Sequence, residues 1–232
     1  HQHCLGSGKM TRLINKCGHL PFTVNHKRVR RIMREHGIRA DYRCPKRQRQ
    51  QAKQAYATAN VVKRQFKQNE INHVWVTDTT EVSYGKQNYK VRLHGVLDLC
   101  GQYLVSYLVT PTETAEGAIA VFERAKQEVG MIAPLVHSDR GAAYTSEAFN
   151  HYLMDNDVQH SYSALGTPAD NAVMEHWWAD FKSIWLNHQP PAQTLEELLK
   201  QIAEGVNSFN TKYISGKRND LTAAEYRNRK AI

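Results

Sequence analysis

A carboxylate interrupts a run of β-branched and aromatic residues, Val74-Trp75-Val76-Thr77-Asp78-Thr79-Thr80. Such residues favour strands, in which alternate side chains point to the same face. Asp78 would therefore share a face with Val74 and Val76. Because burying an unpaired carboxylate is costly, we expect a cation partner or a cleft beside Asp78.

Strand and helix signals continue on the C-terminal side of this run. Alternating or β-rich segments predict strands over 74–84, 89–99, 103–109, 135–137 and 158–162, and a turn over 85–88 joins the first two. Helical patterns cover 112–129, with Thr112 as the expected cap, and then 146–155, 171–187 and 194–209. This order predicts an α/β fold with a mixed five-stranded sheet flanked by helices.

Two further acids stand where such a fold places functional groups. Asp139 follows the short strand predicted at 135–137, and catalytic residues cluster where loops leave the ends of strands. Glu175 lies in the first turn of a predicted helix, with 35 residues between it and Asp139. Taken alone, Asp139 could be an ordinary turn residue, and Glu175 could simply interact with the helix dipole.

Together these acids suit a two-metal phosphoryl-transfer site. Two divalent ions about 3.5–4 Å apart need several carboxylates that converge from different parts of the chain. We therefore hypothesise that Asp78, Asp139 and Glu175 are both the catalytic residues and the metal ligands. Lys182 lies seven residues beyond Glu175, on nearly the same helix face, where its ammonium could contact a phosphate; a solvated lysine is the alternative.

Positive charge is concentrated at the start of the chain. Residues 1–70 carry 17 Lys and Arg against 3 acids, whereas residues 71–232 carry 14 against 19. A basic arm before a mildly acidic body is typical of a nucleic-acid-binding protein, although basic tails can also merely aid solubility. We therefore divide the chain into a basic DNA-binding segment over 1–42, a partly helical linker over 43–70 and a catalytic core over 71–232.

A helix is predicted over 25–36 within the basic segment. Asn25 is its expected N-cap, and Gly37 stands where a left-handed residue is wanted. Val29, Ile32 and Met33 would form its buried face, and a shorter amphipathic stretch over 10–16 would complete a helix-turn-helix-like pair. Its remaining faces, together with the linker, supply the candidate DNA-binding residues Lys27, Arg28, Arg30, Arg31, Arg34 and Arg47.

Several other classes fit the sequence less well. No apolar run approaches the roughly 18 residues that would span a bilayer. The cysteines form no CxxC pair, which favours free thiols and a reducing, cytoplasmic compartment. A chain that begins at His1 is expected to be a fragment. Zinc binding by an N-terminal group is a minor alternative, because the group lacks the short paired spacings of a zinc finger: His3, Cys4, Cys17 and His19.

The sequence resembles the integrase-core transposases of bacterial insertion sequences, in the family whose second reading frame encodes a retroviral-integrase-like DDE domain. The resemblance covers nearly the whole chain. It is carried by Trp75-Val76-Thr77-Asp78-Thr79-Thr80, His137-Ser138-Asp139-Arg140-Gly141, Tyr144-Thr145-Ser146, Gly166-Thr167-Pro168-Ala169-Asp170-Asn171-Ala172 and Glu175, and more loosely by Asn25–Ala40, Lys182 and Leu221–Tyr226.

This resemblance implies a ribonuclease-H-like core in which the three acids hold two Mg²⁺ ions, for which Mn²⁺ would substitute. It implies that the protein nicks the 3′ end of a mobile element and joins the 3′-hydroxyl to another strand. Its partners would be double-stranded DNA, both element ends and target, and at least one further copy of the chain, in the nucleoid of a bacterial cell. Arg140 and Lys182 would contact DNA. A domesticated, non-catalytic DNA-binding protein and a nuclease without strand transfer are the competing readings.

Overall fold

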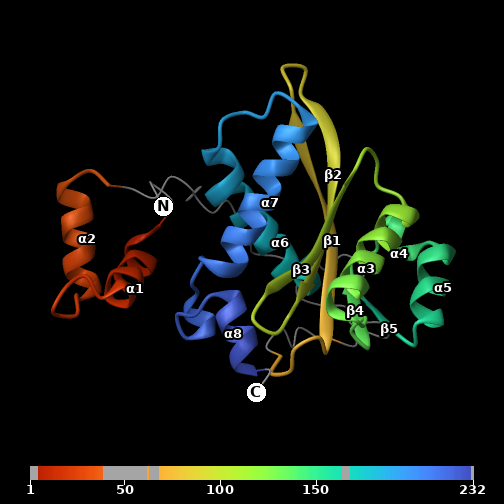
Figure 1. Cartoon of the computed structure of the whole chain (residues 1–232), viewed down its shortest axis with the longest axis horizontal. Coiled ribbons are helices and arrows are strands. Elements are labelled where there is room, and N and C mark those ends of the chain that lie inside the picture. The colour runs from red at the N-terminus through yellow and green to blue at the C-terminus, as the bar shows by residue number, and fades with distance from the viewer. Residues whose placement is uncertain (1–4, 39–61, 63–67, 164–167, 231–232) are drawn as a thin grey trace.

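The computed structural model describes residues 5–38, 62, 68–163 and 168–230. In this part of the chain, a pair of N-terminal helices precedes a sheet that has helices on both faces (Figure 1). No helix among the described residues is long and apolar enough to cross a membrane.

The sheet has five strands and is mixed, as predicted. Its strands are β1 (Val74–Tyr84), β2 (Tyr89–Asp98), β3 (Tyr103–Thr110), β4 (Leu135–Ser138) and β5 (Gln159–Tyr162). They lie in the order β3-β2-β1-β4-β5; the first three are antiparallel, whereas β4 is parallel to both β1 and β5. The parallel ladder between β1 and β4 ends at the pair Thr77 and Ser138, so Asp78 and Asp139 follow it directly on neighbouring strands.

Each face of the sheet packs its own apolar core. On one face, α3 (Ala115–Val129), α4 (Ala142–Thr145) and α5 (Glu147–Asp155) enclose Trp75, Phe122 and Phe149. On the other face, α6 (Ala172–Asp180) and α7 (Leu195–Thr211) enclose a cluster that includes Val76 and Phe181. α8 (Ala223–Lys230) packs beside α7 and β3. Since Val76 belongs to the α6 face, strand alternation directs Asp78 to that face as well.

Two predicted helices differ from the structure in their start or continuity, and α4 and α8 were not predicted. α3 begins at Ala115, because the hydroxyl of Thr114, rather than that of Thr112, accepts the Gly117 amide and caps the helix. The helix predicted over 171–187 is broken into four pieces: a 3₁₀ turn (Pro168–Asn171), α6, a π-helical turn (Phe181–Trp185) and a second 3₁₀ turn (Leu186–His188).

Aromatic packing accompanies the π-helical turn. The rings of Trp177 and Phe181 stack at 5.1 Å, and the indole of Trp185 lies so close to α7 that a Cβ at Gly205 would approach it to 2.5 Å. Trp177 and Phe181 are core residues, as predicted, and Trp185 is half-buried and packs against the same core.

The N-terminal helices are α1 (Ser7–Cys17) and α2 (His26–Glu35), which contact each other. The side chain of Asn25 accepts the Lys27 amide as the predicted cap, and Gly37 has a φ of 65°. Val29 and Met33 are buried, but the prediction that Ile32 joins them is wrong: Ile32 is 40% exposed, because α2 buries only a narrow stripe.

One face of α1 is bound to the C-terminal part of the chain. Arg12 Nε lies 2.7 Å from Asp220 Oδ1, and Lys16 Nζ lies 2.9 Å from Glu225 Oε2. Lys9 contacts the hydroxyl and the ring face of Tyr213. These polar contacts join the N-terminal helix pair to the core.

Candidate active site

The carboxylates of Asp78 and Asp139 are each held by a nearby backbone amide. Asp78 Oδ1 accepts the Thr79 N–H at 2.8 Å, and Asp139 Oδ1 accepts the Gly141 N–H at 2.8 Å. The Oδ2 atom of each carboxylate takes no part in these two hydrogen bonds. Both acids therefore have one oxygen fixed by the backbone and one oxygen that can take another partner.

The pKa of Asp78 responds to the charges of the other predicted acids. Burial is the main cause that raises the pKa of Asp78 to about 7; the Thr79 N–H opposes this shift, and the negative charges of Asp139, Glu175 and Glu113 add to it. Like charges this close disfavour ionisation of the buried member. The charges of the other two predicted acids, and of a fourth acid, Glu113, thus act on Asp78.

Glu175 reaches this site because α6 lies directly against the sheet. Gly95 of β2 is the residue paired with Asp78, and a Cβ there would come within 2.7 Å of Trp178 Cζ2 and 2.8 Å of Met174 Cε. The absence of a side chain at Gly95 lets the helix approach the strand that carries Asp78. This close packing sets where Glu175 lies relative to the sheet.

Glu113 is the acid that the sequence did not single out. It lies in the loop between β3 and α3, and a Cβ at Gly141 would lie 3.0 Å from Asp139 Oδ1 and 3.4 Å from Glu113 Oε1. In the sequence, an acid just before a helix is adequately explained by the helix dipole. Only the fold brings it beside Asp139.

The donor set suits a hard divalent cation. Carboxylate oxygens are the ligands that Mg²⁺ prefers, and a cation would offset the mutual repulsion that raises the Asp78 pKa. Within the described ranges, no three His, Cys, Asp or Glu side chains are already close enough together to form a closed metal site. The residues therefore fit the cation in chemistry and charge, while their final spacing depends on the backbone segments that carry them.

Lys182 lies near the acids, within the π-helical turn. Burial lowers the pKa of its ammonium, whereas the negative charges of Glu81 and Asp78 oppose that shift. Arg140 follows Asp139; its Nε donates to the Ser163 carbonyl at 2.9 Å, and its guanidinium lies 5.5 Å from the centroid of the Tyr162 ring.

The remaining DNA-contact candidates lie away from the acids. Five are exposed on α2, on the side of the molecule remote from the sheet (Figure 1): Lys27, Arg28, Arg30, Arg31 and Arg34. Arg47 lies outside the described residues, as do two of the four candidate zinc ligands, His3 and Cys4.

Two other titratable residues have structural partners. His137 is fully buried between the hydroxyls of Ser161 and Ser163, so it is a packed histidine beside the strand end. Asp98, at the end of β2, is fully buried and forms an ion pair with Arg227. Asp98 is therefore a structural acid rather than a fourth member of the site.

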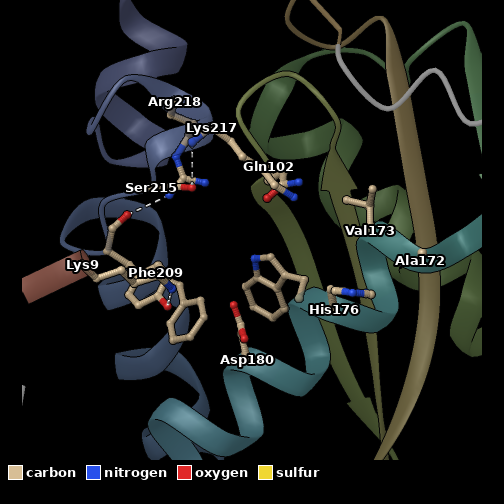
Figure 2. A pocket seen from close by; sticks show the side chains of 12 residues that line it. Lys9, Gln102, Ala172, Val173, His176, Asp180, Phe209, Ser215, Lys217 and Arg218 are labelled. Atoms are coloured by element: carbon tan, nitrogen blue, oxygen red, sulfur yellow. Dashed lines mark hydrogen bonds between the residues drawn. The ribbon is translucent and has the colours of Figure 1, made fainter. Parts of the chain in front are cut away.

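A separate cavity of about 350 Å³ lies along α6. Figure 2 shows His176 and Asp180 of α6 facing it, with Lys9 reaching in from α1. Burial raises the pKa of Asp180, and the charge of Lys9 opposes that shift. Its lining includes none of the three predicted acids.

Family models match two parts of the chain: an integrase core domain over residues 68–168 and an HTH-like domain over residues 1–48. A transposase-like protein of Haemophilus influenzae is 27% identical over 88% of this chain and 93% of its own length. The putative transposase of insertion sequence IS150 from Escherichia coli is 28% identical over 88% of this chain and 72% of its own length.

The fold has a solved counterpart in the HTLV-2 integrase catalytic core domain in complex with magnesium. The likeness has a TM-score of 0.54 at 21% identity and covers 68% of this chain and 97% of that one. It confirms the ribonuclease-H-like architecture of the sheet and its helices. With both domains matched and the relatives named as transposases, the chain is similar to the integrase-core transposases of bacterial insertion sequences.

Proposed function

We propose that Asp78, Asp139 and Glu175 are the catalytic, metal-binding acids of this transposase, which nicks the 3′ end of its element and transfers the 3′-hydroxyl to a second strand. The observation that supports this proposal is that Asp78 and Asp139 directly follow the end of the β1–β4 ladder on neighbouring segments, and that the charges of Asp139 and Glu175 help to raise the pKa of Asp78 to about 7. A strand, the end of a neighbouring strand and a helix supply one acid each, as convergent metal ligation requires.

We further propose Mg²⁺ as the cation, two ions per site, with Mn²⁺ as a substitute. The HTLV-2 integrase core was solved in complex with magnesium, and this supports the choice of metal. Bound there, divalent cations would supply charge stabilisation for the attacking and leaving oxygens of an in-line displacement. The chain's own contribution is to orient the carboxylates: the Thr79 and Gly141 amides fix one oxygen of each aspartate and leave the other for ligation.

DNA binding would be divided between two parts of the chain. The exposed cations of α2, with Arg47 of the linker, would bind the phosphates of double-stranded DNA. Arg140 and Lys182 would position the strand beside the acids. Because two element ends must be brought together, the active form would be at least a homodimer. In a bacterial cell the protein would then act at the nucleoid. The division of the chain after residues 42 and 70 stays a prediction.

A strand-transfer assay separates this function from its two competitors. The substrate is a duplex that carries one of the inverted repeats flanking the gene, incubated with Mg²⁺ and an unlabelled target duplex. A transposase yields a labelled strand longer than the substrate, formed by joining of the 3′-hydroxyl. Cleavage products alone would indicate a nuclease, and binding with neither product would indicate a domesticated DNA-binding protein; either result contradicts the proposal.

A further inference from the structure

A buried tyrosine is linked to the strand of Asp78 from the opposite face of the sheet. Tyr144 lies in α4, five residues after Asp139, and is 1% exposed. Its hydroxyl lies 3.0 Å from Thr79 Oγ1 and 3.3 Å from Thr77 Oγ1, the hydroxyls on either side of Asp78. Since side chains alternate along β1, these threonines point away from the face that Asp78 occupies. Tyr144 can therefore act on the acid only through the backbone.

The direction of each hydrogen bond in this region follows from counting protons. The Thr112 carbonyl can only accept, so the Thr110 hydroxyl donates to it at 2.8 Å and must itself accept from His94 Nε2, also at 2.8 Å. Burial lowers the pKa of His94 to about 4, so the ring is neutral and its Nδ1 accepts from Thr79 at 3.0 Å. The single hydroxyl proton of Thr79 is then used, and Tyr144 must donate to Thr79.

The resulting chain of hydrogen bonds runs Tyr144 to Thr79 to His94, and from His94 through Thr110 to the Thr112 carbonyl. It starts in α4, just after the Asp139 loop, crosses β1 next to Asp78, and ends beside Glu113. Thr79 and Thr110 each donate one hydrogen bond and accept one, so this series of hydrogen bonds has a single direction from Tyr144 to the Thr112 carbonyl. Buried networks of this kind hold their members in one arrangement.

We propose that Tyr144 is a positioning residue of the active site: by donating to Thr79, it fixes the β1 backbone at Asp78 relative to the segment that carries Asp139. This inference rests on the proposed role of these aspartates as metal ligands. In the described part of the chain the acids are not preassembled as a closed metal site. Their spacing when a cation binds is therefore set by how firmly their backbone segments are joined.

Tyr144→Phe tests this with little disturbance to the core. The ring is kept, with its edge-to-face contact to Phe149 at 5.4 Å. Thr79 keeps its bond to His94, and Thr77 keeps its bond to the Gly95 carbonyl. Because outer-shell partners of metal ligands typically change metal affinity by about 10–100-fold, we expect the half-saturating Mg²⁺ concentration to rise about tenfold.

Two readouts measure this concentration: the Mg²⁺-dependent thermal shift of the full chain without DNA, and the Mg²⁺ dependence of strand transfer. Tyr162→Phe is the matched control, because its hydroxyl bonds Asn150 Oδ1 at 2.6 Å and the Tyr144 carbonyl rather than β1. It should leave the Mg²⁺ titration unchanged. A purely structural role for Tyr144 would lower the melting temperature equally with and without Mg²⁺, and would overturn the inference.

Substitutions at Thr79 keep the inference testable if Tyr144→Phe does not fold. Thr79→Val removes the acceptor and should raise the half-saturating Mg²⁺ concentration, whereas Thr79→Ser keeps the hydroxyl and should titrate like the parent. Parental titrations for both Tyr144→Phe and Thr79→Val would overturn the inference. If the parent binds Mg²⁺ in an Asp78-dependent manner but joins no DNA, the proposed function fails while the thermal titration still decides the role of Tyr144.

Discussion

Gly95 offers a way to move the helix that carries Glu175 without touching any acid. It is paired with Asp78 on the neighbouring strand, and a Cβ there would approach Trp178 Cζ2 to 2.7 Å and Met174 Cε to 2.8 Å. Both of these side chains are buried, so neither can swing into solvent. Gly95→Ala should therefore push α6 away from β2.

The size of the effect follows from two opposing contributions. Forcing a methyl group into a well-packed core costs about 1–3 kcal/mol. The lower entropy of the unfolded chain returns about 0.4–1 kcal/mol for a glycine-to-alanine change where the backbone conformation permits it. The net loss in the free energy of unfolding is therefore about 1–2 kcal/mol, and at about 2–4 °C per kcal/mol for a chain of this size the melting temperature should fall by about 2–8 °C.

The rate of strand transfer should also fall, because α6 carries Glu175. Misplacement of a reacting group by about 1 Å can cost on the order of 100-fold in rate, so a shift of a few tenths of an ångström should lower strand transfer about tenfold. The rate is measured well below the melting temperature of the variant, where the protein is folded. Circular dichroism gives the melting temperature on the same samples.

Gly8→Ala is the matched control for Gly95→Ala. A Cβ at Gly8 would meet nothing within 4 Å, and the residue lies in the first turn of α1. It should leave strand transfer unchanged and stabilise the fold by up to about 1 kcal/mol. In the double variant Gly95→Ala/Trp178→Phe, the smaller ring removes the overlap with the indole and leaves only that with the flexible end of Met174, so part of the rate should return. A Gly95→Ala protein with parental melting temperature and parental rate would refute the reasoning.

Three further outcomes are expected. Arg227→Met leaves the buried Asp98 carboxylate without its cation and should cost about 3–5 kcal/mol in urea unfolding, so parental stability would contradict that ion pair. Burial lowers the pKa of His160 from 6.5 to about 4, so between these values the unfolded chain binds a proton that the folded chain does not. The free energy of unfolding should therefore fall as the pH drops from 6.5 to about 4, and it should fall less steeply in His160→Gln. Arg12→Glu should speed amide hydrogen exchange in α1 by opposing Asp220, and adding Asp220→Arg should slow it again; unchanged exchange would show that this pair does not hold α1.

Local pattern was sufficient to predict the strands of the sheet. The β-branched run around Asp78 and the turn after Tyr84 are encoded within a few residues, and the structure has both where they were expected. The helix breaks after Asp180 were not predictable in this way. They follow from aromatic rings packing against α7, a contact between segments far apart in the chain.

Only those parts of the candidate site that leave a local pattern in the sequence were predictable. Asp78 is conspicuous because a carboxylate replaces an apolar residue on a strand face. Glu113 is explained equally well by the helix dipole until the fold places it beside Asp139. The contribution of Tyr144 depends on hydroxyls of β1 that lie 65 and 67 residues away in sequence, and no local pattern reports such a contact.

The most direct test of the central claim is to remove one negative charge at a time from the proposed metal ligands. Asp78→Asn, Asp139→Asn and Glu175→Gln are nearly isosteric, so each variant should fold and should still bind duplex DNA through the exposed cations of α2. Two divalent cations at neighbouring positions repel each other, and the negative charges of the carboxylates offset this repulsion.

The measurement is 3′-end nicking and strand transfer in Mg²⁺ by each single variant and by one double variant. We predict that every single substitution abolishes both reactions, that Mn²⁺ restores at most a little activity, and that the double variant is scarcely worse, because the three residues act as one unit. If any one of the three variants nicks and joins DNA at the parental rate, that residue is not a metal ligand and the account of the site is contradicted.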